Sequence, residues 1–337
     1  MASGGSRSVK SRIAKQAKTV AAQWSFVVAE SLGLRPKTEQ TPAPPVGLDG
    51  DAWNSAELAS CWLGHATTLL KVNGKTLLTD PHFDDRAGLR LGQRKIGRRR
   101  AVGVPIGPEG LPPVDVLMLS HAHMDHWDID SLLRLTRLPW ASKAAVVIPR
   151  GTRDLLPAGF GEVVELDWGK EAKVRGVGMR AVRPKHWGAR FVVDRHRGYN
   201  AYVLDGHGRR VVFGGDTAMT DAFDHLSSTR PVVDLAVMGI GSYEPWEHQH
   251  ATPEQVAEMS RRMGARLLMP VHHATFHDSN VPLAEPLARL VKAWEPDRLV
   301  CPNVGDVWLL PGPSGTDGVR GNPPGTDGVP GPDALRQ

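Results

Sequence analysis

Three histidines and one aspartate fall within six residues of this chain, at His121, His123, Asp125 and His126. An apolar run at residues 114–119 comes immediately before them and predicts a buried strand. Packing these side chains together without a cation would leave polar groups unpaired, at a cost of roughly 1–3 kcal/mol each. Imidazole nitrogens and carboxylate oxygens are ligands that zinc prefers. The segment therefore predicts a metal site at the carboxyl end of a strand.

The flanking sequence has the pattern of a layered α/β domain. Asp128 suits the N-cap of a helix over residues 129–138, which Pro139 would stop. Asn73-Gly74 and Asp205-Gly206 predict hairpin turns, because such residues tolerate positive φ. Further strands are predicted at residues 59–63, 68–72, 76–79, 144–148, 163–166, 173–177, 178–184, 191–193, 200–204, 210–213, 232–238, 267–271 and 307–310, and further helices at 253–263 and 283–294.

Polar residues follow several of these strands in the same way as the first cluster. His186, Asp216 and His272 each lie just past the end of a predicted strand. Strands of one sandwich can converge at a common rim, which would bring these residues to residues 121–126. Seven such positions are enough for two tetrahedral zinc ions that share a carboxylate and keep a position open for water.

Length and composition bound the remaining possibilities. The 337 residues could form two average domains or one large α/β domain. The only cysteines, Cys61 and Cys301, imply no disulfide framework and favour a reducing, cytoplasmic location. The net charge of +5 does not by itself indicate a nucleic-acid partner, and none is expected. No apolar run approaches the roughly 20 residues that a membrane span needs.

Both ends of the chain differ from the central part. Residues 1–45 form a basic N-terminal extension and a Pro-rich linker, and residues 1–25 contain five Lys and Arg but no acid. An apolar stripe in this extension predicts a helix that lies on the inner membrane surface, or alternatively a solvated extension that docks on the domain. Residues 312–337 are rich in Gly and Pro and predict a disordered tail.

Residues 86–100 contain seven Lys and Arg and are predicted to form a long basic loop. A solvated surface is one interpretation. Because the segment precedes the metal motif, the competing interpretation is that it holds an anionic substrate. The candidate substrate-binding residues are Arg94, Arg98 and Arg99.

The spacing from His121 to His126, with His186, Asp216 and His272 downstream, resembles the metallo-β-lactamase fold superfamily. More narrowly, it resembles the branch that contains N-acyl-phosphatidylethanolamine-hydrolysing phospholipase D and lactonase-like bacterial hydrolases. Supporting stretches lie at residues 62–67, 78–81, 215–217, 240–245 and 249–250. The resemblance implies an αββα sandwich, with two mixed β-sheets flanked by helices, and a hydrolase domain over residues 46–311.

The resemblance also assigns individual residues. It implies one zinc ion held by His121, His123 and His186, a second held by Asp125, His126 and His272, and Asp216 as the bridge between them. His272 is preferred to its neighbour His273, because the spacing from His272 to Thr275 and Phe276 matches the family. His65 and Asp80 would orient the ligands. The candidate catalytic residues are Asp125 and His250, the latter for substrate contact or proton transfer.

The implied reaction is attack by a metal-activated hydroxide, because zinc lowers the pKa of bound water to about 7. The expected cofactor is a pair of zinc ions, with iron or manganese as alternatives. A phosphodiesterase acting on a phospholipid or a small-molecule diester is favoured. A lactonase or other carbonyl hydrolase is the alternative of the same fold, and a metal-binding scaffold without catalysis is the alternative of another class. The oligomeric state is not predicted.

Overall fold

The computed structural model describes residues 25–311, apart from residues 26, 35, 38, 192 and 278–280. The predicted surface helix of the N-terminal extension and the predicted disordered tail lie almost entirely outside the described residues. Among the described residues, no helix is both long enough and apolar enough to cross a bilayer.

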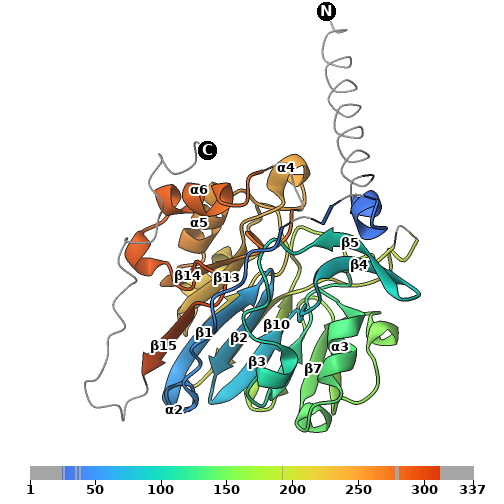
Figure 1. The fold of residues 1–337 in the computed structure, drawn as a ribbon. Helices are drawn as coiled ribbons and strands as arrows, with labels where there is room; N and C mark the ends of the chain where they lie inside the picture. Colours follow the sequence, from blue (N-terminus) through green and yellow to red (C-terminus); the bar gives the residue numbers. More distant parts are fainter. Residues whose placement is uncertain are drawn as a thin grey trace, which may run out of the picture.

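Two mixed sheets form the centre of the molecule (Figure 1). The first sheet has the order β15-β1-β2-β3-β6-β7-β8, in which β3, β6, β7 and β8 run parallel and the other neighbours antiparallel. Its strands are β1 (Ala56–Gly64), β2 (Thr67–Val72), β3 (Lys75–Thr79), β6 (Val116–Met118), β7 (Ala145–Pro149), β8 (Val163–Leu166) and β15 (Val307–Pro311).

The second sheet has the order β14-β13-β12-β11-β10-β9. Here β12, β13 and β14 are parallel, whereas β9 to β12 form an antiparallel meander. Its strands are β9 (Glu171–Val174), β10 (Val177–Val182), β11 (Ala201–Gly206), β12 (Arg209–Phe213), β13 (Leu235–Gly239) and β14 (Leu267–Val271).

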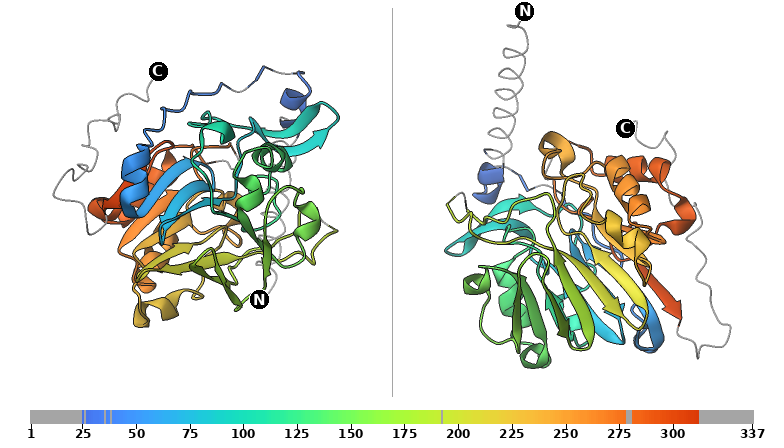
Figure 2. Two further views of the ribbon diagram at one scale, coloured as in Figure 1. Left: turned by 90° about the horizontal axis from the view of Figure 1, so that it is seen from below. Right: turned by 180° about the vertical axis from the view of Figure 1, so that it is seen from behind.

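Apolar side chains divide these elements into four layers. Alternate residues of facing strands, such as Leu70 and Met118 on one sheet and Phe213 on the other, form a shared core between the sheets. The opposite faces pack on helices: α2 (Gly50–Ser55) and α3 (Ile129–Leu135) cover the first sheet, and α5 (Pro253–Arg262) and α6 (Glu285–Ala293) cover the second. Figure 2 shows the same layering from two further sides. The predicted αββα sandwich is confirmed.

Turn residues explain where the hairpins close. Asn73 and Gly74 both have positive φ, 56° and 69°, and form the predicted turn between β2 and β3. The second predicted turn, at residues 205–206, was placed two residues early. Asp205 still pairs with Arg210 in the ladder, and the turn lies at His207-Gly208, which have φ of 49° and 77°.

Other elements also differ from the sequence prediction. The strand predicted at residues 173–177 ends at Val174, because Arg175 and Gly176 have positive φ and turn the chain into β10. Helix α3 ends at Leu135 rather than residue 138, because Pro139 disfavours helical geometry before it and the chain continues in tighter turns. No strand forms at Phe191, whose backbone N–H donates to Asp194 Oδ1 at 2.7 Å and so closes a turn. Residues 86–100 are not a loop. They form a two-stranded hairpin of β4 (Arg86–Leu91) and β5 (Arg94–Arg99), which turns at Gly92.

Candidate metal centre

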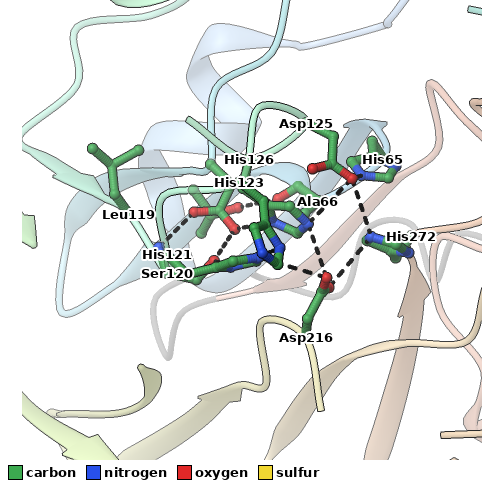
Figure 3. A network of polar contacts seen from close by, with 12 residues as sticks. His65, Ala66, Leu119, Ser120, His121, His123, Asp125, His126, Asp216 and His272 are labelled. Carbon is green, nitrogen blue, oxygen red and sulfur yellow. Dashed lines mark hydrogen bonds and ion pairs between the residues drawn. The ribbon is translucent and has the colours of Figure 1, made fainter. Parts of the chain in front are cut away.

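Residues 119–128 leave β6 and close into a tight turn before α3. The backbone N–H groups of His126 and Trp127 both donate to the carbonyl of His123, at 3.1 and 2.8 Å. Asp128 then caps α3 as predicted, accepting from the Ser131 backbone N–H at 3.0 Å. This geometry projects the histidines of the turn from one side of the loop, toward the carboxyl ends of strands from both sheets (Figure 3).

One group of ligand atoms comes from His121, His123, His186 and Asp216, and these atoms all lie within 4.8 Å of one another. His123 Nδ1 lies 2.8 Å from His121 Nε2 and 3.3 Å from His186 Nε2. His186 follows β10 and Asp216 follows β12, whereas the other two follow β6. The structure therefore brings together the residues that the sequence analysis assigned to the first ion and to the bridge.

A second group within the same 4.8 Å limit contains His65, Asp125, His126 and His272. Three of these are the residues predicted for the second ion. His65 was predicted only to orient ligands, yet its Nε2 lies 3.1 Å from Asp125 Oδ2 and inside the group. It reaches this position from the β1–β2 turn with a positive φ of 52°.

Asp216 lies between the two groups. Its Oδ2 is 3.2 Å from His126 Nε2 and 3.7 Å from the Nε2 atoms of both His121 and His186. Its other oxygen, Oδ1, is 3.3 Å from His272 Nε2. Asp216 therefore contacts both groups: Oδ2 lies between His121 and His186 of the first group and His126 of the second, and Oδ1 faces His272 of the second.

Buried hydrogen bonds fix the orientation of the imidazoles. His126 Nδ1 donates to Asp80 Oδ2 at 2.7 Å, and His121 Nδ1 donates to Ser120 Oγ at 2.9 Å. Ser120 Oγ in turn donates to Asp80 Oδ2 at 2.5 Å. His186 Nδ1 donates to the carbonyl of Gln249 at 3.1 Å. Each of these bonds leaves an Nε2 lone pair directed at the centre, which is the arrangement that metal-ligating histidines use.

The charges of the donor set fit a bound cation. Burial lowers the pKa of His121 and His186 well below the usual value, so both rings are neutral and able to ligate. Burial also acts on His126, but Asp216 and Asp125 oppose it and hold the pKa of that ring well above normal. His126 Nε2 and Asp216 Oδ1 are buried without a hydrogen-bond partner of good geometry. Within the described part of the chain, every ion pair of Asp125 and Asp216 is with a histidine. A divalent metal would supply the positive charge that this centre lacks.

A family model described as the Beta-lactamase superfamily domain matches residues 75–273. The chain belongs to the metallo-β-lactamase superfamily. An uncharacterised protein of Mycobacterium tuberculosis is 32% identical over 283 residues, which cover 82% of this chain and 73% of that protein. The Caenorhabditis elegans protein named N-acyl-phosphatidylethanolamine-hydrolyzing phospholipase D 1 is 30% identical over 263 residues, which cover 73% of this chain and 72% of the relative.

Solved structures show the same fold. A possible metal-dependent hydrolase from Veillonella parvula matches with a TM-score of 0.59 and 17% identity, covering 76% of this chain and 100% of that one. The family match, the relatives and the His and Asp groups make the chain a metal-dependent hydrolase of the metallo-β-lactamase superfamily.

The remaining predicted site residues of this superfamily member lie at different distances from the centre. His250 is at its edge, with Nδ1 3.8 Å from Asp216 Oδ2 and a side chain 16% exposed, and it forms a third group within the same 4.8 Å limit with Asp216 and His272. His273 packs its ring on Trp62, with centroids 4.5 Å apart, and belongs to neither ligand group.

The predicted substrate-binding arginines lie on the β4–β5 hairpin. Arg94 Nη1 donates to the carbonyl of Leu32 at 3.0 Å, and Arg99 Nε donates to Asp85 at 3.0 Å. Arg98 pairs with Ala87 across the ladder. None of these three contacts reaches the ligand groups, so a role for these arginines in the centre itself stays a prediction.

Sequence reasoning missed two residues that shape the centre. Ser120 links His121 to Asp80, and its only sequence signal was its place directly before the motif. Trp187 places its ring edge-on to His123, with centroids 4.9 Å apart, and is 41% exposed at the mouth of the centre. The only sequence signal for Trp187 was its position next to the predicted ligand His186.

Proposed function

We propose that this hydrolase is a zinc-dependent phosphodiesterase with a dinuclear centre, acting on a phospholipid or a related diester. The observation that carries the dinuclear part is Asp216, whose carboxylate lies between the two groups and contacts members of both. The C. elegans relative supports the substrate class, because its name describes a phospholipase D and the alignment covers most of both chains. Five imidazoles and two carboxylates, counted over the seven predicted ligands, suit zinc.

Two bound zinc ions would lower the pKa of a water to about 7 and stabilise negative charge on the substrate oxygens. The chain's own contribution is to hold the ligands in place. Asp80 fixes the His126 ring directly and the His121 ring through Ser120. His65 donates to Asp125, and the backbone carbonyl of His65 accepts from the His272 N–H at 2.9 Å. His65 thus connects ligands from two different loops.

His250 is the residue best placed to move a proton. It borders the ligand groups and, unlike the nearly inaccessible His121 and His126, keeps part of its side chain exposed. A substrate in the centre would meet this exposed side. His250 would hydrogen-bond the leaving-group oxygen and donate a proton to it.

The test is a substrate panel assayed with zinc-loaded protein: bis-p-nitrophenyl phosphate, an N-acylated phospholipid, a lactone and a β-lactam. Hydrolysis of the two phosphodiesters alone supports the proposal. Hydrolysis of the lactone alone would replace it with the carbonyl hydrolase of the same fold. No turnover of any substrate by a protein with two bound zinc ions would favour the scaffold without catalysis.

Asp125→Ala tests the role of the centre in that turnover. Asp125 is a predicted metal ligand and catalytic residue. Its loss should lower turnover roughly 10³-fold, equivalent to several kcal/mol of transition-state stabilisation. Asp130→Ala is the matched control, because Asp130 pairs with Arg90 outside the ligand groups. Undiminished diester turnover in a folded Asp125→Ala protein would contradict the proposal.

A further inference from the structure

The β4–β5 hairpin has two faces of different chemistry. In its ladder Leu89 pairs with Ile96 and Leu91 pairs with Arg94. Residues at alternate positions share a face, so these four side chains lie on one face of the hairpin, together with Arg98. Leu89 is 38% exposed and Leu91 is 59% exposed. This outward face combines large apolar side chains with arginines.

The opposite face carries the cations that the body of the protein neutralises. Arg90 Nε donates to Asp130 at 2.8 Å, and Lys95 Nζ contacts Asp84 at 2.9 Å as well as Asp128 and Asp130. The carboxylates beneath the hairpin are therefore engaged on the inward side.

Residues 27–34 pack against the hairpin and contact both of its faces, since Arg86 of the opposite face pairs with Glu30 at 3.0 Å. The hairpin contacts them through Arg94 and the carbonyl of Leu32, and through Ser31 Oγ, which donates to the carbonyl of Gly97 at 3.3 Å. Figure 1 shows this helical segment beside the hairpin, at the same end of the molecule. Of eleven exposed large apolar side chains in the described residues, five belong to these two segments: Val28, Leu32, Leu34, Leu89 and Leu91. Such concentration marks an interaction surface.

This surface adjoins the metal centre. Lys95 anchors the hairpin to Asp128, three residues after Asp125. Arg190 anchors the neighbouring loop to the carbonyls of Ala122 and Trp127, at 3.1 and 2.9 Å. Docking through the hairpin would therefore place a partner close to the mouth of the centre.

We propose that the outward face of the β4–β5 hairpin, with residues 27–34, docks on an anionic lipid bilayer. Charge complementarity selects this partner: exposed leucines beside arginines suit an interface in which apolar chains lie beneath negative headgroups. The sequence before Ser25 is basic as well, because residues 1–24 contain five Lys and Arg and no acid. The proposal does not rest on diester hydrolysis, since binding is measured without turnover.

Co-sedimentation of the full chain with vesicles tests the proposal. Wild-type protein should bind vesicles of phosphatidylglycerol and phosphatidylcholine, bind pure phosphatidylcholine more weakly, and lose affinity as salt is raised. Leu91→Ser with Arg94→Glu should weaken binding to the anionic vesicles at least ~20-fold, since each cation near such a surface contributes about fivefold. The matched control is Val291→Ser with Lys292→Glu on α6, which changes an exposed apolar residue and a charge elsewhere and should bind as wild type.

Thermal unfolding confirms that each variant is folded. Equal binding of the hairpin variant and wild type would overturn the proposal, even if residues 1–24 alone hold the chain on vesicles. Absence of wild-type binding would also overturn it. A concentration-dependent dimer that the hairpin variant abolishes, without vesicle binding, would reassign the face to a second copy of the chain.

Discussion

Two clusters of aspartates lie close together in this molecule and neutralise their charge differently. In the first, Asp84, Asp128 and Asp130 surround the Lys95 ammonium, whose side chain is only 6% exposed. In the second, Asp125 and Asp216 have only imidazoles around them. In the first cluster, Lys95 supplies the positive charge from within the chain. The second holds ionised carboxylates and, apart from His126 with its raised pKa, neutral rings in ligand geometry, and so favours a cation from outside.

The two clusters are close along the chain, because only His126 and Trp127 separate Asp125 of one from Asp128 of the other. Burial lowers the pKa of Lys95, but Asp128 and Asp84 outweigh it and raise that pKa, so the ammonium stays charged. Similar acidic surroundings can thus be a structural ion pair or a metal site. A lysine ammonium makes the first cluster an ion pair, whereas imidazoles make the second cluster a metal site.

The largest expected effect is that of metal removal on stability. A ligand at 1,000 times its Kd adds about 4 kcal/mol to the free energy of unfolding, so two ions contribute about twice that. Calorimetry with and without a chelator should show a large fall in the unfolding temperature, reversed by zinc. If the chelated and zinc-loaded proteins unfold alike, the second cluster does not depend on a cation.

Removing the internal cation should come next in size. Lys95→Met leaves three carboxylates together beneath the hairpin and should cost about 3–5 kcal/mol of unfolding free energy, measured in urea. Adding Asp130→Asn should recover part of this loss, because one uncompensated charge is removed. Bound metal should stay at the wild-type amount in both proteins. A loss of metal equal to that of an Asp125 variant would show that the two clusters are one unit.

A smaller effect is expected from removing His65, which connects the predicted metal ligands Asp125 and His272. His65→Ala removes the hydrogen bond to Asp125 and should lower metal affinity or turnover 10–100-fold. Competition with a chelating dye should show one of the two ions weakened more than the other. His65→Gln keeps an N–H donor and should restore part of the affinity. Equal affinities in all three proteins would reduce His65 to a packing residue.

The smallest effect concerns an exposed ion pair. The hydrogen bond from Arg289 lowers the pKa of Glu254 to about 2. A carboxylate with a depressed pKa stabilises the fold above its ordinary pKa of about 4.5, and this contribution disappears as pH falls toward 2. The pair is solvent-screened, so Arg289→Gln should cost under about 1 kcal/mol at pH 7 and nothing near pH 2. A cost that is the same at both pH values would contradict the assignment.

Much of the fold follows from local signals in the sequence. Asn73-Gly74 closes a hairpin because both residues adopt positive φ, and Thr252 with Gln255 forms the capping box that starts α5. The hairpin of residues 86–100 could not be predicted, because its strands depend on distant carboxylates. Lys95 and Arg90 are stabilised by Asp128 and Asp130, which are remote in sequence.

The candidate site also has one part that local sequence shows and one part that depends on contacts between distant segments. The spacing of residues 121–126 is local, and so the first cluster of ligands was visible in the sequence. The role of His65 depends on another loop. Its carbonyl accepts a hydrogen bond from the His272 N–H, and its own N–H donates to Thr275 Oγ1 at 2.7 Å. Such contacts between loops are set by the packing of the two sheets.

Anomalous diffraction from zinc-loaded crystals tests the central claim most directly. We expect two peaks of similar height, one at each of the two groups that Asp216 contacts and roughly 3.5–4 Å apart, as in other two-metal sites. No peak is expected among Asp84, Asp128 and Asp130, where Lys95 already supplies the charge. A single peak, or zinc beside Lys95 and none at Asp216, would contradict it.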